Sequence, residues 1–545
     1  MKRWSRGVLI GVLALACLAP GSPGLRAQEP SAPAQEAPAV SLSLSEVLQS
    51  ALEKNLDIAV RRFDPKVAET RVETQEAVFS PNLEFSAKDG ENTQPSSSAL
   101  SGGTVVTDSD RTFAGTYSDA FKLGSTLQFT LFTHRNSTNN SFSTVIPSYY
   151  TQALATYTQP LLRNFGLEVN ETQIIIAKNN HEISQWQFRQ TVMDTLAAAE
   201  AAYYDLNLAL MNMKTAEAYL KLAQDFLDQT RIRVRVGTLP PIEITQAEAG
   251  VADREGTVIV ARSAIRAAED QLRRLMNIPS DSPLWNQPVH PTDEPQVLDK
   301  IVDVDEAIRT AMEKRPDLEQ ARLDLSSRDA DLRYRKNQKL YRLDLIAQYG
   351  ASGLSGKFLP VTQVYYTADP TPPGCIPLPN DSSRCSVTTD PPDLDIGESY
   401  KQVKDRDFST WSAELQLGIP LGNRAAKAAY AAAKYSEDQA KLTIQQLEQA
   451  AQVEVRTAAR DIDTNLKRYR AAQVNTRLQT EKLNAEQKKY ENGMSTTYQV
   501  LQFQTDLTNA RARENLAIVD YNKSLVELDR VLGILLDTRN VSVSD

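Results

Sequence analysis

Histidine and cysteine are scarce in this chain, whose 545 residues hold three of each. His134, His181 and His290 are too widely spaced for a His-rich metal site. His181-Glu182 begins a zinc-protease-like motif, but Gln185 stands where the second histidine is needed. Gly-x-Ser-x-Gly, phosphate-loop and dinucleotide motifs are also missing, so the sequence predicts no catalytic residues, no cofactor and no metal, and the protein is not expected to be an enzyme.

Excess positive charge and long apolar runs are lacking as well. Lys and Arg number 60 against 69 Asp and Glu, a net charge of −9, so no basic stripe exists to neutralise the phosphates of a nucleic acid. Beyond the N-terminal segment, no run reaches the roughly 20 apolar residues that a membrane-spanning helix needs. If the chain enters a membrane, it must therefore do so as β-strands.

The chain opens with a targeting segment. Basic residues precede an apolar stretch at 8–19, and a small-residue cleavage site follows. This pattern predicts a signal peptide over 1–27 and a flexible leader over 28–42. Cleavage before a lipidated Cys17 is an open alternative, although Ala14 stands where such signals normally carry Leu.

What the chain has instead is a tandem repeat. Matching residues recur after 260 positions in the first part of each copy and after 256 positions further on: Glu46 and Glu306, Ala51 and Ala311, Gly90 and Gly350, Pro160 and Pro420, Gly237 and Gly493, Gln246 and Gln502, Leu272 and Leu528. The residue pattern of each copy predicts a helix, strands, a very long helix, a glycine turn and another helix, in that order. The predicted boundaries are a first repeat at 43–278, a linker at 279–302, a second repeat at 303–536 and a tail at 537–545.

The long helices dominate each copy. From Gly166 to Gly237, and from Gly422 to Gly493, helical patterning persists for about 70 residues, or about 105 Å. Shorter helices are predicted on either side of these segments, and two of them end to end would match one long helix. The predicted elements are shorter helices at 46–79, 242–276, 305–340 and 499–532, with long helical hairpins at 167–278 and 423–533.

Strand patterning occupies about 82–160 and 342–420. Apolar residues alternate with mostly polar ones from Leu343 to Tyr349 and from Trp411 to Ile419, as the wall of a water-filled barrel in lipid requires. A half-buried soluble sheet gives the same alternation. Polar stretches within the first strand region, at 91–110 and 135–148, are expected to be exposed loops.

Cys375 and Cys385 lie in a Pro-rich stretch that neither a helix nor a regular strand would tolerate, so a loop is expected there. An exported protein meets an oxidising compartment, which favours a disulfide between them, while two unpaired thiols are the alternative. The loop joins the two strand segments of the second copy opposite the helices. We therefore expect the disulfide at the outer mouth of such a barrel, at the end opposite the helices.

Together these residues resemble the TolC-like outer-membrane efflux and secretion channels. The resemblance covers nearly all of the chain after the signal segment, and it rests on the repeat and on the motifs at 44–55, 159–163, 236–238 and 490–493. It implies a mainly α fold with a β-barrel, in which a tandem-repeat α-helical barrel continues into a trimeric outer-membrane β-barrel. A homotrimer is implied, served by a periplasmic adaptor and an inner-membrane pump.

The resemblance also identifies a gate at the glycine turns. Many members of the family carry an acidic ring and a basic latch where this chain has Gln499, Gln502 and Ser495. Glu243 matches an acidic position expected to bond Tyr490. The candidate tip residues are Gly237, Glu243, Gln246, Tyr490, Gly493, Ser495, Gln499 and Gln502.

The predicted function is that of a passive exit duct in the cell outer membrane, with a helical extension into the periplasm. It would serve a tripartite efflux pump or a type I secretion system. A periplasmic adaptor is an alternative, but an adaptor would carry one helical hairpin and not the whole unit twice. A structural envelope protein with a coiled-coil stalk would explain the helices but not the repeat.

Overall fold

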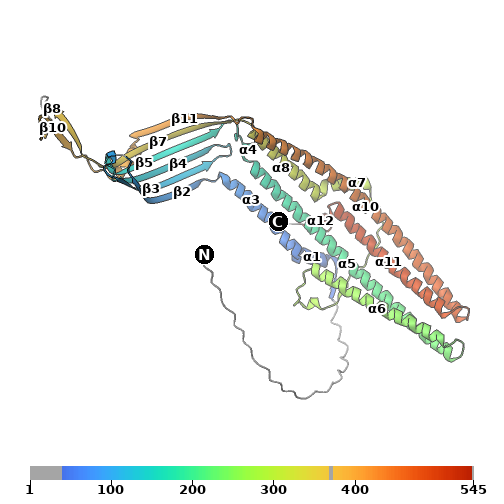
Figure 1. The fold of residues 1–545 in the computed structure, drawn as a ribbon. Coiled ribbons are helices and arrows are strands. Elements are labelled where there is room, and N and C mark those ends of the chain that lie inside the picture. Colours follow the sequence, from blue (N-terminus) through green and yellow to red (C-terminus); the bar gives the residue numbers. More distant parts are fainter. Residues whose placement is uncertain (1–39, 98, 367–371, 543–545) are drawn as a thin grey trace, which may run out of the picture.

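The computed structural model describes residues 40–97, 99–366 and 372–542. The predicted signal peptide and most of the predicted leader lie outside these ranges. The molecule is elongated, with a sheet at one end and a layer of long helices at the other (Figure 1). Within the described ranges, no helix combines the length and the apolar content needed to cross a membrane.

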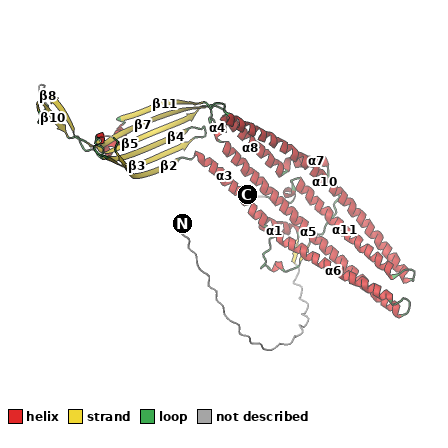
Figure 2. Ribbon diagram, in the orientation of Figure 1, coloured by secondary structure: helices red, strands yellow, loops and turns green. Residues whose placement is uncertain are grey.

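Helices form the larger part of the molecule (Figure 2). They are α1 (Leu44–Lys54), α2 (Leu56–Arg61), α3 (Phe63–Glu76), α4 (Leu167–Asn170), α5 (Thr172–Arg235), α6 (Ile242–Leu275), α7 (Val304–Lys314), α8 (Pro316–Gln338), α9 (Ile396–Asp405), α10 (Arg424–Glu491), α11 (Thr497–Val531) and α12 (Leu535–Thr538), with short 3-10 turns η1 (Ala77–Phe79), η2 (Ala99–Ser101) and η3 (Pro283–Trp285). The long helices α5 and α10 have 64 and 68 residues, so each is about 100 Å long at about 1.5 Å per residue.

The helices expected at 46–79 and 305–340 are not continuous, which corrects the sequence-based prediction. Asn55 adopts an extended conformation and its side chain caps α2 by accepting from the backbone N–H of Asp57 at 2.8 Å. Arg315 is extended at the equivalent point because Pro316 follows it, and a residue before proline disfavours the helical conformation. Each copy therefore breaks its first helix at the same place.

These breaks connect the shorter helices of each copy. The Asn55 side-chain amide donates to the carbonyl of Leu275, the last residue of α6, at 2.8 Å. Arg315 Nη1 donates to the carbonyl of Val531, the last residue of α11, at 3.4 Å. A helix end has carbonyls without helical partners, so both contacts satisfy such groups. The shorter helices thus follow one another beside the long helices (Figure 1).

The main sheet is antiparallel throughout, with the order β11-β7-β5-β4-β3-β2. Its strands are β2 (Asn82–Pro95), β3 (Val105–Ala120), β4 (Thr126–Thr138), β5 (Val145–Pro160), β7 (Arg342–Phe358) and β11 (Phe408–Gly418). A parallel pair joins the leader to the linker, and a three-stranded sheet projects beyond the main one: β1 (Val40–Leu42) with β6 (Val289–Pro291), and β8 (Val361–Tyr366), β10 (Asp381–Thr389) and β9 (Ile376–Leu378).

The loops expected at 91–110 and 135–148 are mostly strand, and that expectation was wrong. Of the described residues in these stretches, only 96–97, 99–104 and 139–144 lie between the strands. Polar residues continue the strands because they pair across them. Thr93 and Thr107 place their hydroxyls 3.3 Å apart, and Arg111 Nε lies 3.1 Å from Asp89 Oδ2. Such cross-strand pairs stabilise a sheet without apolar side chains.

The two copies use the same length of chain differently. In the second copy β7 pairs directly with β11. Their counterparts after a shift of 260 residues are β2 and β5, which are separated in the sheet by β3 and β4. The corresponding stretch of the second copy, between β7 and β11, forms the projecting sheet and α9 instead.

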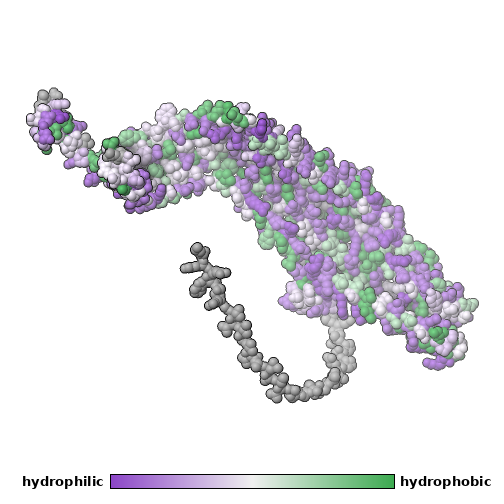
Figure 3. Space-filling view, viewed as in Figure 1, coloured by the Kyte–Doolittle hydropathy of each residue, from purple (hydrophilic) through white to green (hydrophobic). Residues whose placement is uncertain are grey.

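The main sheet has one apolar and one polar face, because side chains alternate along each strand. The apolar face carries Leu83, Phe85, Phe113, Tyr117, Leu127, Phe129, Leu131, Tyr157, Leu343, Leu345, Tyr349, Trp411, Leu415 and Leu417. The other face is mostly polar and carries Asn82, Glu84, Ser86, Thr112, Thr116, Ser118, Gln128, Thr130, Thr156, Thr158, Asp344, Gln348, Glu414 and Gln416, with Phe132, Leu154 and Ile346 among them. The hydrophobic surface extends to where β11 meets the helices, through the exposed Ile419 and Leu421 (Figure 3).

Helix α9 marks the outer limit of the apolar face. Its Ser399 hydroxyl lies 2.8 Å from that of Thr151, and its Tyr400 hydroxyl lies 2.8 Å from that of Thr133. Gly353 allows this approach, because a Cβ there would lie 2.2 Å from the carbonyl oxygen of Ser399. The apolar residues named above lie at this level or between it and the helices.

Candidate functional site: the tips of the helical hairpins

The two glycine turns lie at the end of the molecule farthest from the sheet (Figure 1). Gly237 and Gly493 have φ of 80° and 75°, in the left-handed region that favours glycine. Each turn closes its long helix with a backbone bond to the carbonyl five residues earlier, from Thr238 to Arg233 at 2.9 Å and from Met494 to Lys489 at 2.8 Å. This is the Schellman arrangement, and it gives both copies the same hairpin.

Tyr490 joins the two hairpins. Its side chain is 3% exposed, and its ring lies 5.1 Å from that of Phe226 on α5. The hydroxyl lies 3.3 Å from the hydroxyl of Thr230 and 3.2 Å from that of Thr497. Tyr490 therefore contacts both hairpins through its ring and its hydroxyl.

Arg233 contacts the same tyrosine from α5. Its guanidinium carbon lies 4.7 Å from the centre of the Tyr490 ring. Nη1 donates to the carbonyl of Tyr490 at 2.8 Å, and Nη2 donates to the carbonyl of Glu491 at 3.4 Å. A cation near the C-terminal carbonyls of a helix is favourable, so Arg233 on the first hairpin binds the end of α10 on the second.

The expected bond between Glu243 and Tyr490 is absent, which corrects the sequence-based prediction. Glu243 lies in the first turn of α6, and its Oε2 is buried without a hydrogen-bond partner. The tyrosine hydroxyl is instead used by two threonines, Thr230 and Thr497. Thr230 contacts the hydroxyl from α5 and Thr497 contacts it from the start of α11.

Ser495 takes part in a different interaction from a basic latch. Its hydroxyl donates to Glu486 Oε1 at 2.6 Å and lies 3.0 Å from Gln499 Oε1. Lys489 lies 3.2 Å from the other oxygen of Glu486. The hydrogen bond from Ser495, followed by that from Lys489, holds the pKa of Glu486 below its usual value. The turn of the second hairpin thus contains an ionised carboxylate.

Gln246 and Gln502 come together in a pocket of about 320 Å³ between α6 and α11. Asp253 also lines this pocket, and Asp506 accepts from Gln502 Nε2 at 3.2 Å. Two carboxylates therefore lie within one or two turns of the neutral glutamines. The sequence-based interpretation missed them because it considered only the positions that the resemblance marked.

Comparison with known proteins identifies the family. A model of the family described as "Outer membrane efflux protein" matches residues 126–277 and 307–534, which is more than half of the chain. The chain belongs to the outer membrane efflux protein family. Among curated proteins, no sequence matches the chain. The family is one of outer-membrane transport channels, so the chain is assigned to the outer membrane and to efflux.

Solved structures of efflux channels share the fold. The CmeC outer membrane channel of Campylobacter jejuni has a TM-score of 0.62 at 13% identity, covering 90% of this chain and 86% of that one. VceC of Vibrio cholerae has 0.61 at 13%, covering 90% and 96%. The MtrE channel of Neisseria gonorrhoeae in its open state has 0.59 at 16%, covering 92% and 91%. At these identities the likeness establishes the fold, which combines a long-helix barrel with a β-domain.

Arg233 is the tip residue that the resemblance did not mark, yet the repeat contains a signal for it. A shift of 256 residues places Arg233 on Lys489, so both copies carry a cation four residues before the glycine. The structure gives the two cations different partners, since Lys489 pairs with Glu486 inside its own hairpin. Only a three-dimensional arrangement distinguishes these two uses.

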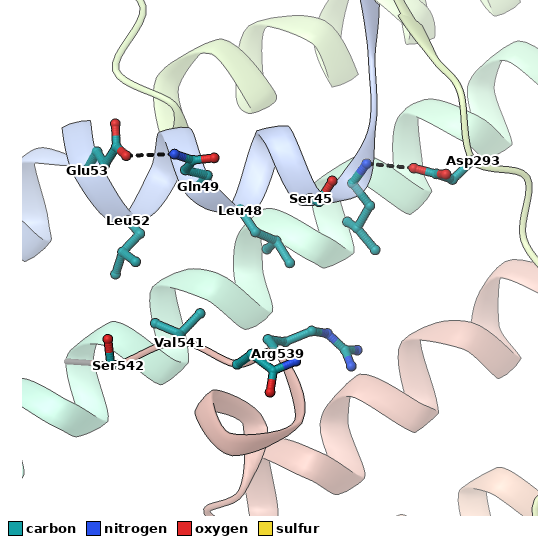
Figure 4. A pocket seen from close by; sticks show the side chains of 11 residues that line it. Ser45, Leu48, Gln49, Leu52, Glu53, Asp293, Arg539, Val541 and Ser542 are labelled. Atoms are coloured by element: carbon teal, nitrogen blue, oxygen red, sulfur yellow. Dashed lines mark hydrogen bonds between the residues drawn. The ribbon is translucent and has the colours of Figure 1, made fainter.

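A second pocket of about 610 Å³ lies midway along the helices, between α1 and the C-terminal segment (Figure 4). Leu48, Leu52 and Val541 face it in the figure, and Arg539 lies at its edge. Arg539 donates to both oxygens of Glu200 on α5, at 2.8 and 3.1 Å. Burial raises the pKa of Glu200, and Arg539 opposes that shift. This ion pair fixes the C-terminal segment to the long helix.

Cys375 and Cys385 form a disulfide in the projecting sheet, with an S–S distance of 1.99 Å. Cys385 belongs to β10 and is 2% exposed. The projecting sheet lies beyond the main sheet, at the end opposite the hairpin tips (Figure 1).

Proposed function

We propose that three copies of the chain form the outer-membrane exit duct of a tripartite efflux pump or a type I secretion system. The duct is passive and performs no chemistry. The observation that carries this proposal is that both lateral edges of the single chain are left open. Among the residues that the structure describes, β2 pairs only with β3 and β11 pairs only with β7.

The open strands are complementary. The antiparallel order means that β2 and β11 run in opposite directions, so β2 of one copy is oriented to pair with β11 of the next. An exposed strand edge is a liability, because its row of free backbone groups can pair with another chain. A ring of copies leaves no edge, and a heterologous contact closes when the rotation between copies allows it.

The helix layer has open edges on the same two sides. On α2 and α3, Leu56, Val60, Phe63 and Val67 form an exposed stripe with helical spacing. On α10, Tyr435, Leu442 and Val453 are exposed at comparable spacing. These stripes are on opposite sides of the layer, whose order next to the sheet is α3, α5, α8 and α10. We expect each stripe to be covered by the neighbouring copy.

The number three follows from the family resemblance, and it fixes the width of the tunnel. Four helices spaced about 9 Å apart make a layer about 36 Å wide, so three copies enclose a tunnel whose wall is about 34 Å across. The apolar face of the sheet would contact lipid, and the helices would extend into the periplasm. The hairpin tips would then face a periplasmic adaptor and the inner-membrane pump.

The proposal is tested by the size of the assembly in detergent. We expect the purified protein to have the mass of a trimer by light scattering. Phe63→Glu with Val67→Glu places charge in the apolar stripe and should yield monomers, whereas Glu73→Lys, on an exposed part of α3 outside the stripe, should leave the trimer intact. A monodisperse monomer or dimer in the unmodified protein would refute the proposal.

A further inference from the structure

We propose that the hairpin formed by β3 and β4 widens the membrane barrel, so that the duct keeps its full width through the sheet and admits bulky solutes. This inference rests on the proposed trimer. Three six-stranded sheets would make an eighteen-stranded barrel. A barrel built from β2, β5, β7 and β11 alone would have twelve strands.

The repeat shows that β3 and β4 are additional to the basic unit. The second copy needs only β7 and β11 to connect α8 with α10. A shift of 260 residues aligns β7 with β2, and β11 with β5. The first copy could therefore connect α3 with α5 through β2 and β5, and it forms two further strands from the chain between them.

The two additional strands have both faces of a membrane wall. Phe113 and Tyr117 on β3, and Phe129 and Leu131 on β4, continue the apolar face across the sheet. On the other face, β3 and β4 carry hydroxyl and amide side chains: Thr112, Thr116, Ser118, Gln128 and Thr130. Strands with one lipid-facing and one water-facing side are the units of a water-filled barrel. β3 and β4 therefore add to the circumference of the barrel.

Six strands also match the helix layer in width. Strands spaced about 4.8 Å apart and tilted by about 40° occupy about 37 Å for six and about 25 Å for four. Four helices occupy about 36 Å. Only the six-stranded sheet continues the helical tunnel without narrowing it.

The resulting lumen sets which solutes the sheet admits. Eighteen strands give a backbone diameter of about 36 Å, against about 24 Å for twelve. With about 5 Å of side chain on each side, the openings are about 26 Å and about 14 Å. A solute about 20 Å across, such as a compact polypeptide or a large polar conjugate, passes only the first. Selection by size is then left to the hairpin tips.

The experiment measures how large a polymer can enter from the outer side. A cysteine at position 156, made by Thr156→Cys, lies on the polar face of β5 between Gln128 and Gln348. The trimer in nanodiscs is treated with a small maleimide and with a maleimide-polymer about 20 Å across, a size chosen between the two openings. The native cysteines of the projecting sheet are disulfide-bonded and do not react. We expect the maleimide-polymer to label the unmodified barrel at a rate similar to that of the small maleimide.

A deletion variant removes the additional strands. Replacing residues 96–144 by Asn-Gly joins β2 to β5 through a two-residue hairpin turn and leaves the apolar residues of both strands on one face. Labelling by the polymer should fall at least about tenfold relative to the small maleimide, since the opening becomes narrower than the polymer. Deleting residues 361–389, which contain the strands of the projecting sheet, is the matched control and should change neither rate, because these strands lie outside the main sheet.

The possible outcomes separate this inference from the proposed function. A chain that is not a trimer contradicts the proposed function. A trimer whose cysteine reacts with the small maleimide but excludes the polymer contradicts the wide barrel. If the deletion variant does not assemble, electron microscopy of the unmodified trimer decides the matter. Eighteen strands in the wall support the inference, and twelve overturn it.

Discussion

The contact between Arg233 and the end of α10 should hold the hairpin tips together. Replacing Arg233 by Ala removes a cation near the Tyr490 ring and a charge-assisted hydrogen bond of 2.8 Å to the Tyr490 carbonyl. A partly exposed cation–π contact contributes about 0.5–1 kcal/mol, and a hydrogen bond from a charged group contributes about 1.5–2 kcal/mol. The arrangement of the tips in this structure, which we expect to be the closed one, should therefore lose about 2–3 kcal/mol.

This loss should be visible as channel opening. A change of about 2–3 kcal/mol shifts an equilibrium about 30- to 150-fold, so Arg233→Ala should raise the open fraction of the resting channel by that factor. Single-channel recording in planar bilayers measures it directly. The open fraction of Arg233→Lys should fall between those of the unmodified channel and Arg233→Ala, because lysine keeps the charge but not the planar pair of donors.

Arg231 provides a matched control in the same turn of α5. Its guanidinium lies 2.9 Å from Glu248 and 3.5 Å from Asp228, on the exposed surface and within one hairpin. Exposed ion pairs contribute up to about 1 kcal/mol, so Arg231→Ala should change the open fraction less than about fivefold. Equal open fractions for Arg233→Ala and Arg231→Ala would refute the role assigned to Arg233.

Three further predictions concern the rest of the chain. Arg539→Ala leaves Glu200 as a buried unpaired carboxylate, which should cost about 3–5 kcal/mol near neutral pH. Burial already raises the pKa of Glu200, so this loss of stability should shrink as the pH falls through that raised pKa and the carboxyl becomes neutral. Thermal unfolding at two pH values measures the loss of stability, and a loss that is the same at both would contradict the prediction. Gln499→Asp with Gln502→Asp should introduce block by multivalent cations added on the periplasmic side in planar bilayers, because rings of like charge set ion preference; an unchanged current would contradict it. Replacing both cysteines of the disulfide by serine should leave export rates unchanged, since the bridge lies outside the main sheet, and a loss of export with normal trimer yield would count against this.

The helices could be predicted from the sequence because their signal is local and periodic. Both glycine turns and the shorter helices α6 and α11 begin and end within two residues of their predicted positions. The outer parts of the strands could not be predicted in this way. Their Thr, Ser, Asn and Asp residues are typical of loops, and they form strand only because partners such as Thr107 and Arg111 lie opposite them.

The additional strands illustrate a different limit. The repeat needs no gap between the two copies at the strands, which suggests that the copies fold alike. Equal chain length nevertheless supplies two wall strands in the first copy and a projecting sheet with α9 in the second. At the tip, the resemblance marked Glu243 as the partner of Tyr490, but the tyrosine hydroxyl is used by threonines. Side-chain choices of this kind depend on the packing of four helices, and no single segment specifies them.

The helix breaks at Asn55 and Arg315 have a mechanical consequence. Each copy contains one continuous rod, α5 or α10, beside a rod spliced from shorter helices. Bending a continuous helix sharply disrupts main-chain hydrogen bonds, whereas a splice held by a side-chain contact to Leu275 or Val531 can change its angle at the cost of that contact. The interrupted helices can thus bend when the hairpin tilts relative to the sheet, while α5 and α10 remain straight over the full height of the wall.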